Sequence, residues 1–287
     1  MIGKLKSRLI KQFRQFASKL KVHVPVYVPV LESNLLSGRK ALVTGGTGGI
    51  GYAIAKAFLE AGASVCITGR NEDRINAAVK SLQEKSTVDG DSKRTIHGLV
   101  MNNLNIASFP DKVKTICEMM HGLDILVNNA GVVGNDASED SYDLVLATNT
   151  KAPYFLSNLI AKQWAANGIK GNILNVCSSS SLRPGQNPYI ISKWGLRSMT
   201  LGLARSYASN GIVVNGIAPG PTDTDAMKDI SGYGMGVDWA KNPAGRLVTR
   251  QEIANLAVVL VSDLSRMVIG DVLYVSGGAG VVTFDDV

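Results

Sequence analysis

From Lys40 onward the chain alternates short apolar, β-branched runs with segments of helical periodicity. The apolar runs predict strands at residues 41–44, 64–68, 95–101, 124–127, 172–177, 213–217 and 272–275. The helical segments are residues 52–61, 74–84, 109–121, 142–166, 189–209 and 251–261. Apolar strands separated by helices are typical of a parallel sheet that is covered on both faces. Right-handed connections then predict a doubly wound α/β fold of the Rossmann type, with about seven strands in a single domain.

The net charge of the chain comes almost entirely from its first residues. The formal charge is +7, from 30 basic and 23 acidic side chains. Residues 1–21 hold seven of the basic side chains and no acidic one, so residues 39–287 hold 23 basic and 22 acidic groups. A nucleic-acid-binding protein would carry its basic patch on the folded domain. The balanced charge of the domain therefore disfavours nucleic acid as a partner.

Residues 2–20 have the pattern of an amphipathic helix, with apolar positions on one side and most of the basic residues on the other. This composition is typical of a helix that lies on an anionic membrane surface. Two alternatives stay open, namely packing on the domain or on a partner subunit, and organelle targeting. A proline-containing stretch at 22–36 predicts an extended linker. We therefore divide the chain into an arm with its linker at 1–37 and a domain at 38–287.

Composition excludes several other classes of protein. No apolar run reaches the roughly 18 residues that a membrane-spanning helix needs. The three cysteines are far apart, which disfavours a disulfide framework, and no cysteine or histidine spacing predicts a metal site. We expect a cytoplasmic protein, either free or peripheral on a membrane.

The strand at 41–44 runs into a glycine-rich loop, Thr44-Gly45-Gly46-Thr47-Gly48-Gly49-Ile50-Gly51, that opens the next predicted helix. Glycines permit a tight turn and let backbone N–H groups approach a pyrophosphate, and the helix N-terminus adds the positive end of a dipole. The loop predicts a dinucleotide site that includes Gly45, Thr47, Gly49, Ile50 and Gly51.

The end of the second strand indicates which dinucleotide is bound. Folds that bind NAD place an acidic residue there to contact the ribose hydroxyls. This chain has Gly69 followed by Arg70. A carboxylate would repel a 2′-phosphate, whereas a guanidinium can bind it through two hydrogen bonds. The pattern therefore predicts NADP(H) as the cofactor.

A second group of polar residues follows the middle of the chain. Tyr189 and Lys193 are four residues apart on a predicted helix and project from one face. An ammonium close to a phenol favours the phenolate and lowers the pKa of the phenol, which makes it a better acid and base catalyst near neutral pH. The strand at 172–177 ends in four serines beginning at Ser178, at the sheet edge where ligands bind.

With Asn128-Asn129-Ala130-Gly131 after the fourth strand, these motifs resemble the short-chain dehydrogenase/reductase family over about residues 38–280. The glycine string fits both the compact branch of that family and its longer sugar-nucleotide branch. Pro219-Gly220-Pro221-Thr222-Asp223-Thr224 resembles the compact branch, which includes 3-oxoacyl carrier-protein reductases.

The resemblance implies a role for four residues of the reacting site. Tyr189 would exchange the proton with the substrate oxygen, Ser178 would hydrogen-bond that oxygen, and Lys193 would hold the nicotinamide ribose. Asn149 would hold a water molecule in a proton relay. The spacing of Ser178 and Tyr189 is one residue shorter than is usual, which leaves Ser179 as an alternative.

The resemblance also implies further contacts with the cofactor. The nicotinamide-binding segment would contribute Pro219, Gly220, Thr222 and Thr224. The adenosine side of the cleft would contribute Asn129, Ala130 and Gly131. Asn103 stands after the third strand, where the family usually has an acidic residue. The family usually forms homodimers or homotetramers through the helical segments 142–166 and 189–209.

These observations predict an NADP(H)-dependent oxidoreductase that moves a hydride between nicotinamide and a carbonyl or secondary alcohol, acting as a ketone reductase. The substrate class stays open among 3-oxoacyl thioesters, steroid-like ketones, sugars or polyols, and small ketones. A non-enzymatic NADP(H)-binding sensor or scaffold is the alternative, although it would not need the complete set of reacting residues. A nucleotide-sugar epimerase would need a longer carboxyl-terminal region.

We expect NADPH to bind more tightly than NADH, because Arg70 can pair with the 2′-phosphate and no carboxylate stands at Gly69. A charge-assisted hydrogen bond contributes about 1.5–3 kcal/mol, so the dissociation constants should differ about tenfold or more. Titration of cofactor fluorescence measures both constants. Tighter binding of NADH would overturn the assignment of NADP(H).

Overall fold

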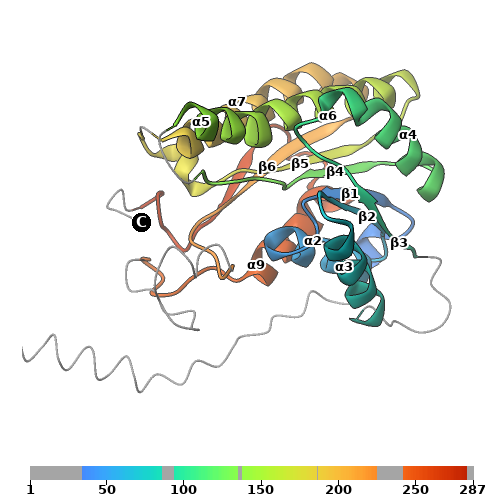
Figure 1. Ribbon diagram of the computed structural model, residues 1–287, viewed down its shortest axis with the longest axis horizontal. Coiled ribbons are helices and arrows are strands. Elements are labelled where there is room, and N and C mark those ends of the chain that lie inside the picture. Colours follow the sequence, from blue (N-terminus) through green and yellow to red (C-terminus); the bar gives the residue numbers. More distant parts are fainter. Residues whose placement is uncertain (1–33, 86–93, 135–137, 186, 225–241, 283–287) are drawn as a thin grey trace, which may run out of the picture. The chain divides into compact units, whose positions relative to one another are not determined.

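Seven parallel strands form one sheet between two layers of helices in the computed structural model (Figure 1). The structure describes residues 34–85, 94–134, 138–185, 187–224 and 242–282. The strands are β1 Lys40–Thr44, β2 Ser64–Gly69, β3 Ile96–Val100, β4 Ile125–Asn128, β5 Asn172–Val176, β6 Val213–Pro219 and β7 Val272–Val275. Their order is β3-β2-β1-β4-β5-β6-β7, and every neighbouring pair is parallel. The predicted doubly wound α/β fold is confirmed.

Helices cover both faces of this sheet (Figure 1). One face carries α2 Gly49–Glu60, α3 Glu72–Lys85 and α9 Arg250–Val261. The other carries α4 Phe109–Met120, α5 Glu139–Leu146, α6 Ala152–Ala166 and α7 Pro188–Tyr207. None of the described helices is both long and apolar enough to cross a membrane.

The strands are mostly apolar because the sheet separates two cores. Val43 and Val127 belong to the cluster that packs against α2 and α9. Leu42 and Leu126, their neighbours in the chain, belong to the cluster that packs against α4 and α6. Successive side chains of a strand point to opposite faces, so a polar side chain inside a strand is buried and must be hydrogen-bonded, as it is for Asn215 of β6.

The predicted helix at 142–166 is two helices with a π-helical turn between them. The first, α5, begins at Glu139, where the Ser138 hydroxyl accepts a hydrogen bond from the Ser141 amide. The π-turn spans Ala147–Lys151 and is followed directly by α6. Its residue Asn149 bonds across to the backbone of another segment, and apolar periodicity contains no signal for such a turn. π-Turns inside helices are frequent at functional sites.

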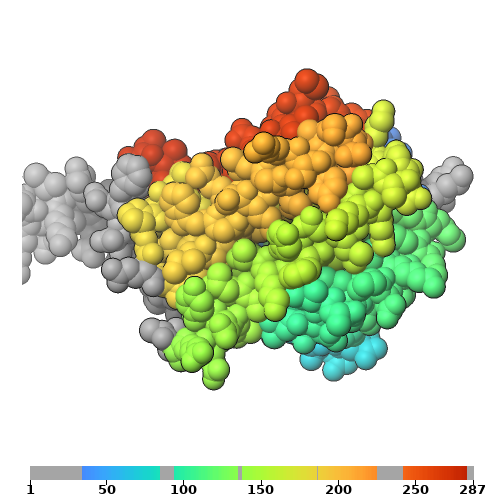
Figure 2. All heavy atoms as spheres, turned by 90° about the horizontal axis from the view of Figure 1, so that it is seen from above, coloured from blue at the N-terminus to red at the C-terminus, as the bar shows by residue number. Residues whose placement is uncertain are grey.

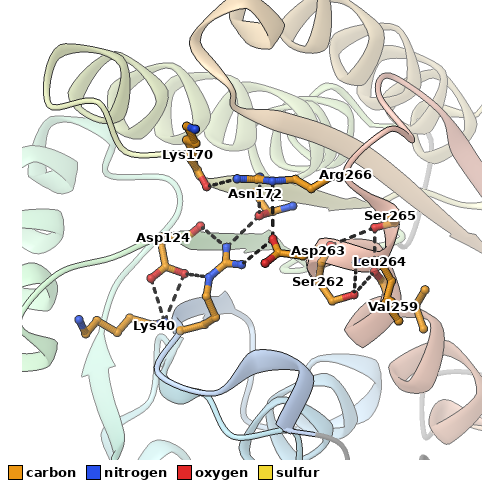
Figure 3. A network of polar contacts seen from close by, with 11 residues as sticks. Lys40, Asp124, Lys170, Asn172, Val259, Ser262, Asp263, Leu264, Ser265 and Arg266 are labelled. Carbon is orange, nitrogen blue, oxygen red and sulfur yellow. Dashed lines mark hydrogen bonds and ion pairs between the residues drawn. The ribbon is translucent and has the colours of Figure 1, made fainter.

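A polar network joins the amino-terminal ends of several strands (Figure 3). Arg39 Nε donates to Asp124 Oδ1 over 2.6 Å, and Arg39 Nη2 donates to Asn172 Oδ1 over 2.8 Å. Arg266 Nη2 donates to the carbonyl of Lys170 over 3.1 Å. These contacts tie together the starts of β1, β4 and β5 and the segment after α9. This edge stabilises the sheet and is separate from the carboxyl-terminal edge, where the candidate site lies.

The start of α9 is held by a reciprocal cap and an ion pair. The Thr249 hydroxyl accepts from the Glu252 amide, and the Glu252 carboxylate accepts from the Thr249 amide. Arg246 Nη1 and Nη2 donate to the two oxygens of the same carboxylate. The hydrogen bonds from Arg246, helped by those from Thr249, lower the pKa of Glu252 to about 2 despite its partial burial.

Replacing Glu252 with Gln should cost stability at neutral pH but not in acid. Because the folded pKa is depressed, the ionised carboxylate stabilises the folded state above about pH 4.5, and this contribution is lost as the pH falls toward 2. Solvent screens the half-exposed pair, so we expect a loss of about 1–2 kcal/mol at pH 7. Urea unfolding of wild type and variant from pH 7 to pH 3 measures it. Glu84→Gln, at an exposed glutamate of α3, is the control, and a pH-independent gap for Glu252→Gln would contradict the prediction.

Candidate active site

Two adjoining cavities lie at the carboxyl-terminal edge of the sheet. The larger, of about 550 Å³, follows the glycine-rich loop and the ends of β2 and β4. The smaller, of about 390 Å³, lies between the end of β5, the start of α7 and the segment after β6. Both are lined by Ile50, Asn129, Gly131, Val132 and Thr224, so they form one continuous cleft. Strand order reverses between β1 and β4, and ligands of doubly wound sheets bind at such a point.

The glycine-rich loop leaves backbone donors free at the larger cavity. Gly48 is the N-cap of α2 and provides no side-chain cap, and a Cβ on Gly48 would meet only open space. Gly45 has φ +65°, and a Cβ there would lie 2.9 Å from Ala130 Cα. A Cβ on Gly51 would lie 2.5 Å from the Gly45 carbonyl oxygen. Gly51 therefore lies behind the loop and permits its tight turn. This cradle fits a pyrophosphate at a helix N-terminus.

Thr44 and Asn129 hold that loop against the end of β4. The Thr44 hydroxyl donates to the Val127 carbonyl and accepts from the amides of Asn129 and Ala130 at 3.0 and 3.1 Å. Asn129 Nδ2 donates to the carbonyls of Thr44 and Gly45 at 2.9 and 3.1 Å. Asn129 was predicted only as a lining residue, and the structure adds this bracing contact.

The predicted specificity residues lie at the far end of the larger cavity. Gly69, Arg70 and Asn103 all line it. A Cβ on Gly69 would lie 3.0 Å from Thr47 Cγ2, so glycine lets β2 end close to the loop. Arg74, which sequence reasoning passed over, also lines this end. Its amide is held by the Asn71 side chain at 2.8 Å.

Ser178, Tyr189 and Lys193 meet in the smaller cavity. Lys193 is buried, and its Nζ donates to the Val176 carbonyl over 2.9 Å. The same Nζ lies 5.7 Å from the centroid of the Tyr189 ring. Helix α7 places both side chains because Asn187 caps its start and accepts from the Ile190 amide. The ammonium of Lys193 therefore lies next to the Tyr189 ring inside the smaller cavity.

The Ser178 hydroxyl is oriented by its own turn. Ser178 caps the 3₁₀ turn Ser179–Leu182, and its Oγ accepts from the Ser180 amide over 3.1 Å. Its hydrogen is thus available for donation toward the cavity. Ser179, the alternative from the sequence, lines the same cavity.

Asn149 lies behind the cleft, outside the lining of both cavities. Its Oδ1 accepts from the Val132 amide, and its Nδ2 donates to the Val132 carbonyl, both over 2.8 Å. Nδ2 also donates to Ser192 Oγ over 3.0 Å. A Cβ on Gly131 would lie 3.2 Å from Asn149 Oδ1 and 3.7 Å from Lys193 Nζ. Asn149 thus connects the π-turn, the segment after β4 and α7 next to the lysine.

The segment after β6 closes one side of the smaller cavity. Pro219, Gly220, Thr222 and Thr224 all line it. Gly220 is required because a Cβ would lie 2.7 Å from Ser276 Cα. The Thr222 hydroxyl donates to the Gly220 carbonyl over 2.8 Å. Residues 225–241, which follow this segment, lie outside the described residues.

Cys177, beside Ser178, is not a nucleophile in this site. Burial raises the pKa of its thiol to about 11 although Lys193 acts in the opposite direction. A thiol of such a pKa holds almost no thiolate at neutral pH. In the described ranges no group of three His, Cys, Asp or Glu residues could hold a metal ion.

Arg183 is a second arginine of the site, besides Arg74, that sequence reasoning missed. It lines the smaller cavity, five residues after Ser178. An arginine in a loop usually reads as a solvated surface residue, so the sequence contained no usable signal for it.

Comparisons with known proteins agree with this geometry. The family model described as Enoyl-(Acyl carrier protein) reductase matches residues 45–280. Gluconate 5-dehydrogenase of Gluconobacter oxydans is 33% identical over 251 residues, which are 85% of this chain and 95% of that protein. The 3-oxoacyl-[acyl-carrier-protein] reductase of Chlamydia trachomatis is 35% identical over 254 residues, which are 86% of this chain and 99% of that protein.

The chain belongs to the short-chain dehydrogenase/reductase family. It is therefore an oxidoreductase of the NAD(P)-dependent class. A crystal structure described as a candidate NAD(P)-dependent gluconate 5-dehydrogenase from Beutenbergia cavernae, with bound NADP at low occupancy, superposes with a TM-score of 0.75. It is 30% identical and covers 86% of this chain and 98% of its own.

Proposed function

We propose that this protein is an NADP(H)-dependent oxidoreductase that interconverts a ketone and a secondary alcohol, with reduction as the working direction. The observation that carries the proposal is the continuous cleft in which Ser178, Tyr189 and Lys193 adjoin the glycine-rich loop. The similar Beutenbergia structure that holds NADP supports the choice of cofactor.

The larger cavity would hold the adenosine half and the pyrophosphate. The amides at the start of α2 would receive the pyrophosphate, and Arg70 would pair with the 2′-phosphate. Asn103, Ala130 and Gly131 would line the adenosine side. When bound, the nicotinamide supplies or accepts the hydride at its C4 carbon.

Residues of the smaller cavity would handle the proton and the substrate oxygen. Ser178 would donate a hydrogen bond to the carbonyl oxygen and hold it beside Tyr189. Tyr189 would donate its phenolic proton to that oxygen as negative charge develops on it. The Lys193 ammonium, held by the Val176 carbonyl, would stabilise the resulting phenolate. Asn149 would keep the π-turn in place beside Lys193 and hold the water of the proton relay.

Tyr189→Phe should abolish carbonyl reduction while leaving NADPH binding intact, because it removes the proton donor and keeps the ring. General acid catalysis contributes about 10²–10⁴-fold, so kcat should fall by that factor. Loss of reduced-nicotinamide absorbance, with a panel of ketones, oxoacyl thioesters and oxo-sugars, measures turnover. Tyr207→Phe, at the end of the same helix, is the matched control. Tight NADPH binding without turnover of any carbonyl by the wild type would favour the sensor instead.

We further propose that the protein is a homodimer or homotetramer. The outer face formed by α5, the π-turn, α6 and α7 carries a groove of about 890 Å³ (Figure 2). The large side chains of Tyr154 and Phe155 are half exposed there, with ring centroids 5.3 Å apart in an edge-to-face pair. A second copy of the chain would bury these rings.

Phe155→Glu should shift the protein toward monomers, because a carboxylate would be buried without a partner in such an interface. Sedimentation velocity of the full chain measures the change. Ala77→Glu, at an exposed position of α3, should leave the assembly unchanged. A wild-type monomer at micromolar concentration would contradict the proposal.

The membrane-contacting arm, residues 2–20, lies outside the described residues, so its contact with an anionic surface stays a prediction. The same holds for the cytoplasmic location, with organelle targeting as the alternative. If a variant that lacks residues 1–21 still bound anionic liposomes as tightly as the full chain, the membrane hypothesis would be wrong.

A further inference from the structure

The described lining of the smaller cavity contains two cations and no acidic side chain. The cations are Lys193 and Arg183. Lys193 is accounted for by its bond to the Val176 carbonyl and its position beside Tyr189. Arg183 has no such assignment in the proposed reaction. A guanidinium is always charged, so its presence in a half-enclosed cavity calls for an anionic partner.

The backbone of Arg183 is fixed from two sides. Its amide donates to the Ser180 carbonyl over 3.2 Å, and its carbonyl accepts from Trp194 Nε1 over 2.9 Å. The residue is therefore anchored to α7, the helix that carries Tyr189 and Lys193. These two bonds hold the backbone of Arg183 in one position relative to the reacting groups.

Most N–H donors of the Arg183 guanidinium have no hydrogen-bond partner among the described residues. Of its five N–H donors, the one hydrogen bond in the described part runs from Nη2 to Ser180 Oγ over 3.0 Å. Nε is buried without a hydrogen-bond partner, near the backbone of Gly280. No carboxylate of the described residues lies within ion-pair distance of Arg183. A bound anion would satisfy donors that the described residues leave without a partner.

Arg183 is also close to the oxygen-binding serine. Its Nη2 bonds to Ser180, and the Ser180 amide bonds to Ser178 Oγ. The guanidinium and the predicted position of the substrate oxygen are thus linked through one residue. A charged group bound by Arg183 would therefore lie in the same cavity as the substrate oxygen.

We propose that Arg183 binds the carboxylate of a small oxo acid and thereby selects that class of substrate. This inference rests on the proposed reductase function and names its substrate class. A phosphate on a long carrier arm is the other source of negative charge, but its distance from the reacting carbon disfavours it here. Arg183 acts on substrate binding and takes no part in proton transfer.

The test compares substrates that differ only in the charged group. One pair is 5-oxogluconate and L-sorbose, and a second is acetoacetate and methyl acetoacetate. The full-length wild type with NADPH should reduce the acid of at least one pair with a kcat/KM at least about tenfold above that of its neutral partner. Arg183→Gln should remove this preference mainly through KM and leave the neutral partner unaffected. Arg183→Lys should retain part of it, and Arg205→Gln is the matched control at the end of α7.

A further pair separates the two sources of charge. Acetoacetyl-coenzyme A carries phosphates on a long arm, whereas acetoacetyl-N-acetylcysteamine carries none. An Arg183→Gln effect confined to the coenzyme A thioester would overturn the carboxylate assignment. Equal reduction of acid and neutral partner in every pair would overturn it as well, while turnover that needs Tyr189 would leave the reductase function standing.

A binding measurement keeps the proposal testable if no carbonyl is turned over. Calorimetry would follow 5-oxogluconate and acetoacetate binding to Tyr189→Phe saturated with NADPH. We expect binding of an acid that weakens about tenfold or more when Arg183→Gln is added. No binding of either acid, or binding that is insensitive to Arg183→Gln, would overturn the anion site separately from the catalytic proposal.

Discussion

Every inner strand of this sheet is packed on both faces, and that constraint decides where chemistry can occur. Leu42 and Val43 are adjacent in the chain and fully buried, yet they belong to cores on opposite sides. A polar side chain in the middle of such a strand would have to leave water on either face. Polar groups are therefore either hydrogen-bonded inside the sheet or placed at the strand ends, with Arg39, Asp124 and Asn172 at one edge (Figure 3) and the cleft at the other.

Polar side chains that are buried between strands and helices are matched to one another. Asn128 Nδ2 donates to Ser157 Oγ and Asn175 Oδ1, both over 2.8 Å, and Asn175 Nδ2 donates to Thr200 Oγ1 over 2.9 Å. This chain of bonds links β4 and β5 to α6 and α7. It fixes the helix that carries Tyr189 and Lys193 relative to the strands that end at the cleft. Buried hydrogen bonds of this kind specify one arrangement, because breaking one leaves a costly unmatched group.

The positive potential in the two cavities of the cleft comes from different groups. In the larger cavity, backbone amides at the start of α2 contribute positive potential beside the glycine-rich loop, and Arg70 and Arg74 add charge at the far end. In the smaller cavity, two fixed cations supply it, and each has a different backbone attachment. Lys193 lies next to the Tyr189 ring. Most donors of Arg183 have no hydrogen-bond partner among the described residues. Lys193 and Arg183 are both basic and both lie close to α7, so their different surroundings come from the geometry of the folded chain.

Much of this protein was predictable from local sequence. Apolar strands with helices between them predict the sheet. Gly45, Gly49 and Gly51 predict the cradle, because glycine permits a close approach of the backbone. Tyr189 and Lys193 share a face because helical periodicity places residues four apart together. The main error was the uninterrupted helix at 142–166, since the π-turn at Ala147–Lys151 leaves no mark on apolar periodicity.

Tertiary structure decided what depends on contacts between distant segments. Asn149 bonds to Val132 only because the π-turn meets the segment after β4, and Asn129 braces a loop more than 80 residues away in sequence. Arg183 is an unremarkable loop arginine until α7 and the turn after β5 enclose it beside Ser178. Local sequence determined the fold, the glycine-rich loop and the shared helix face of Tyr189 and Lys193, through periodicity and the small size of glycine. The environment of each charge was decided by packing, because hydrogen-bond partners and burial exist only in the folded chain.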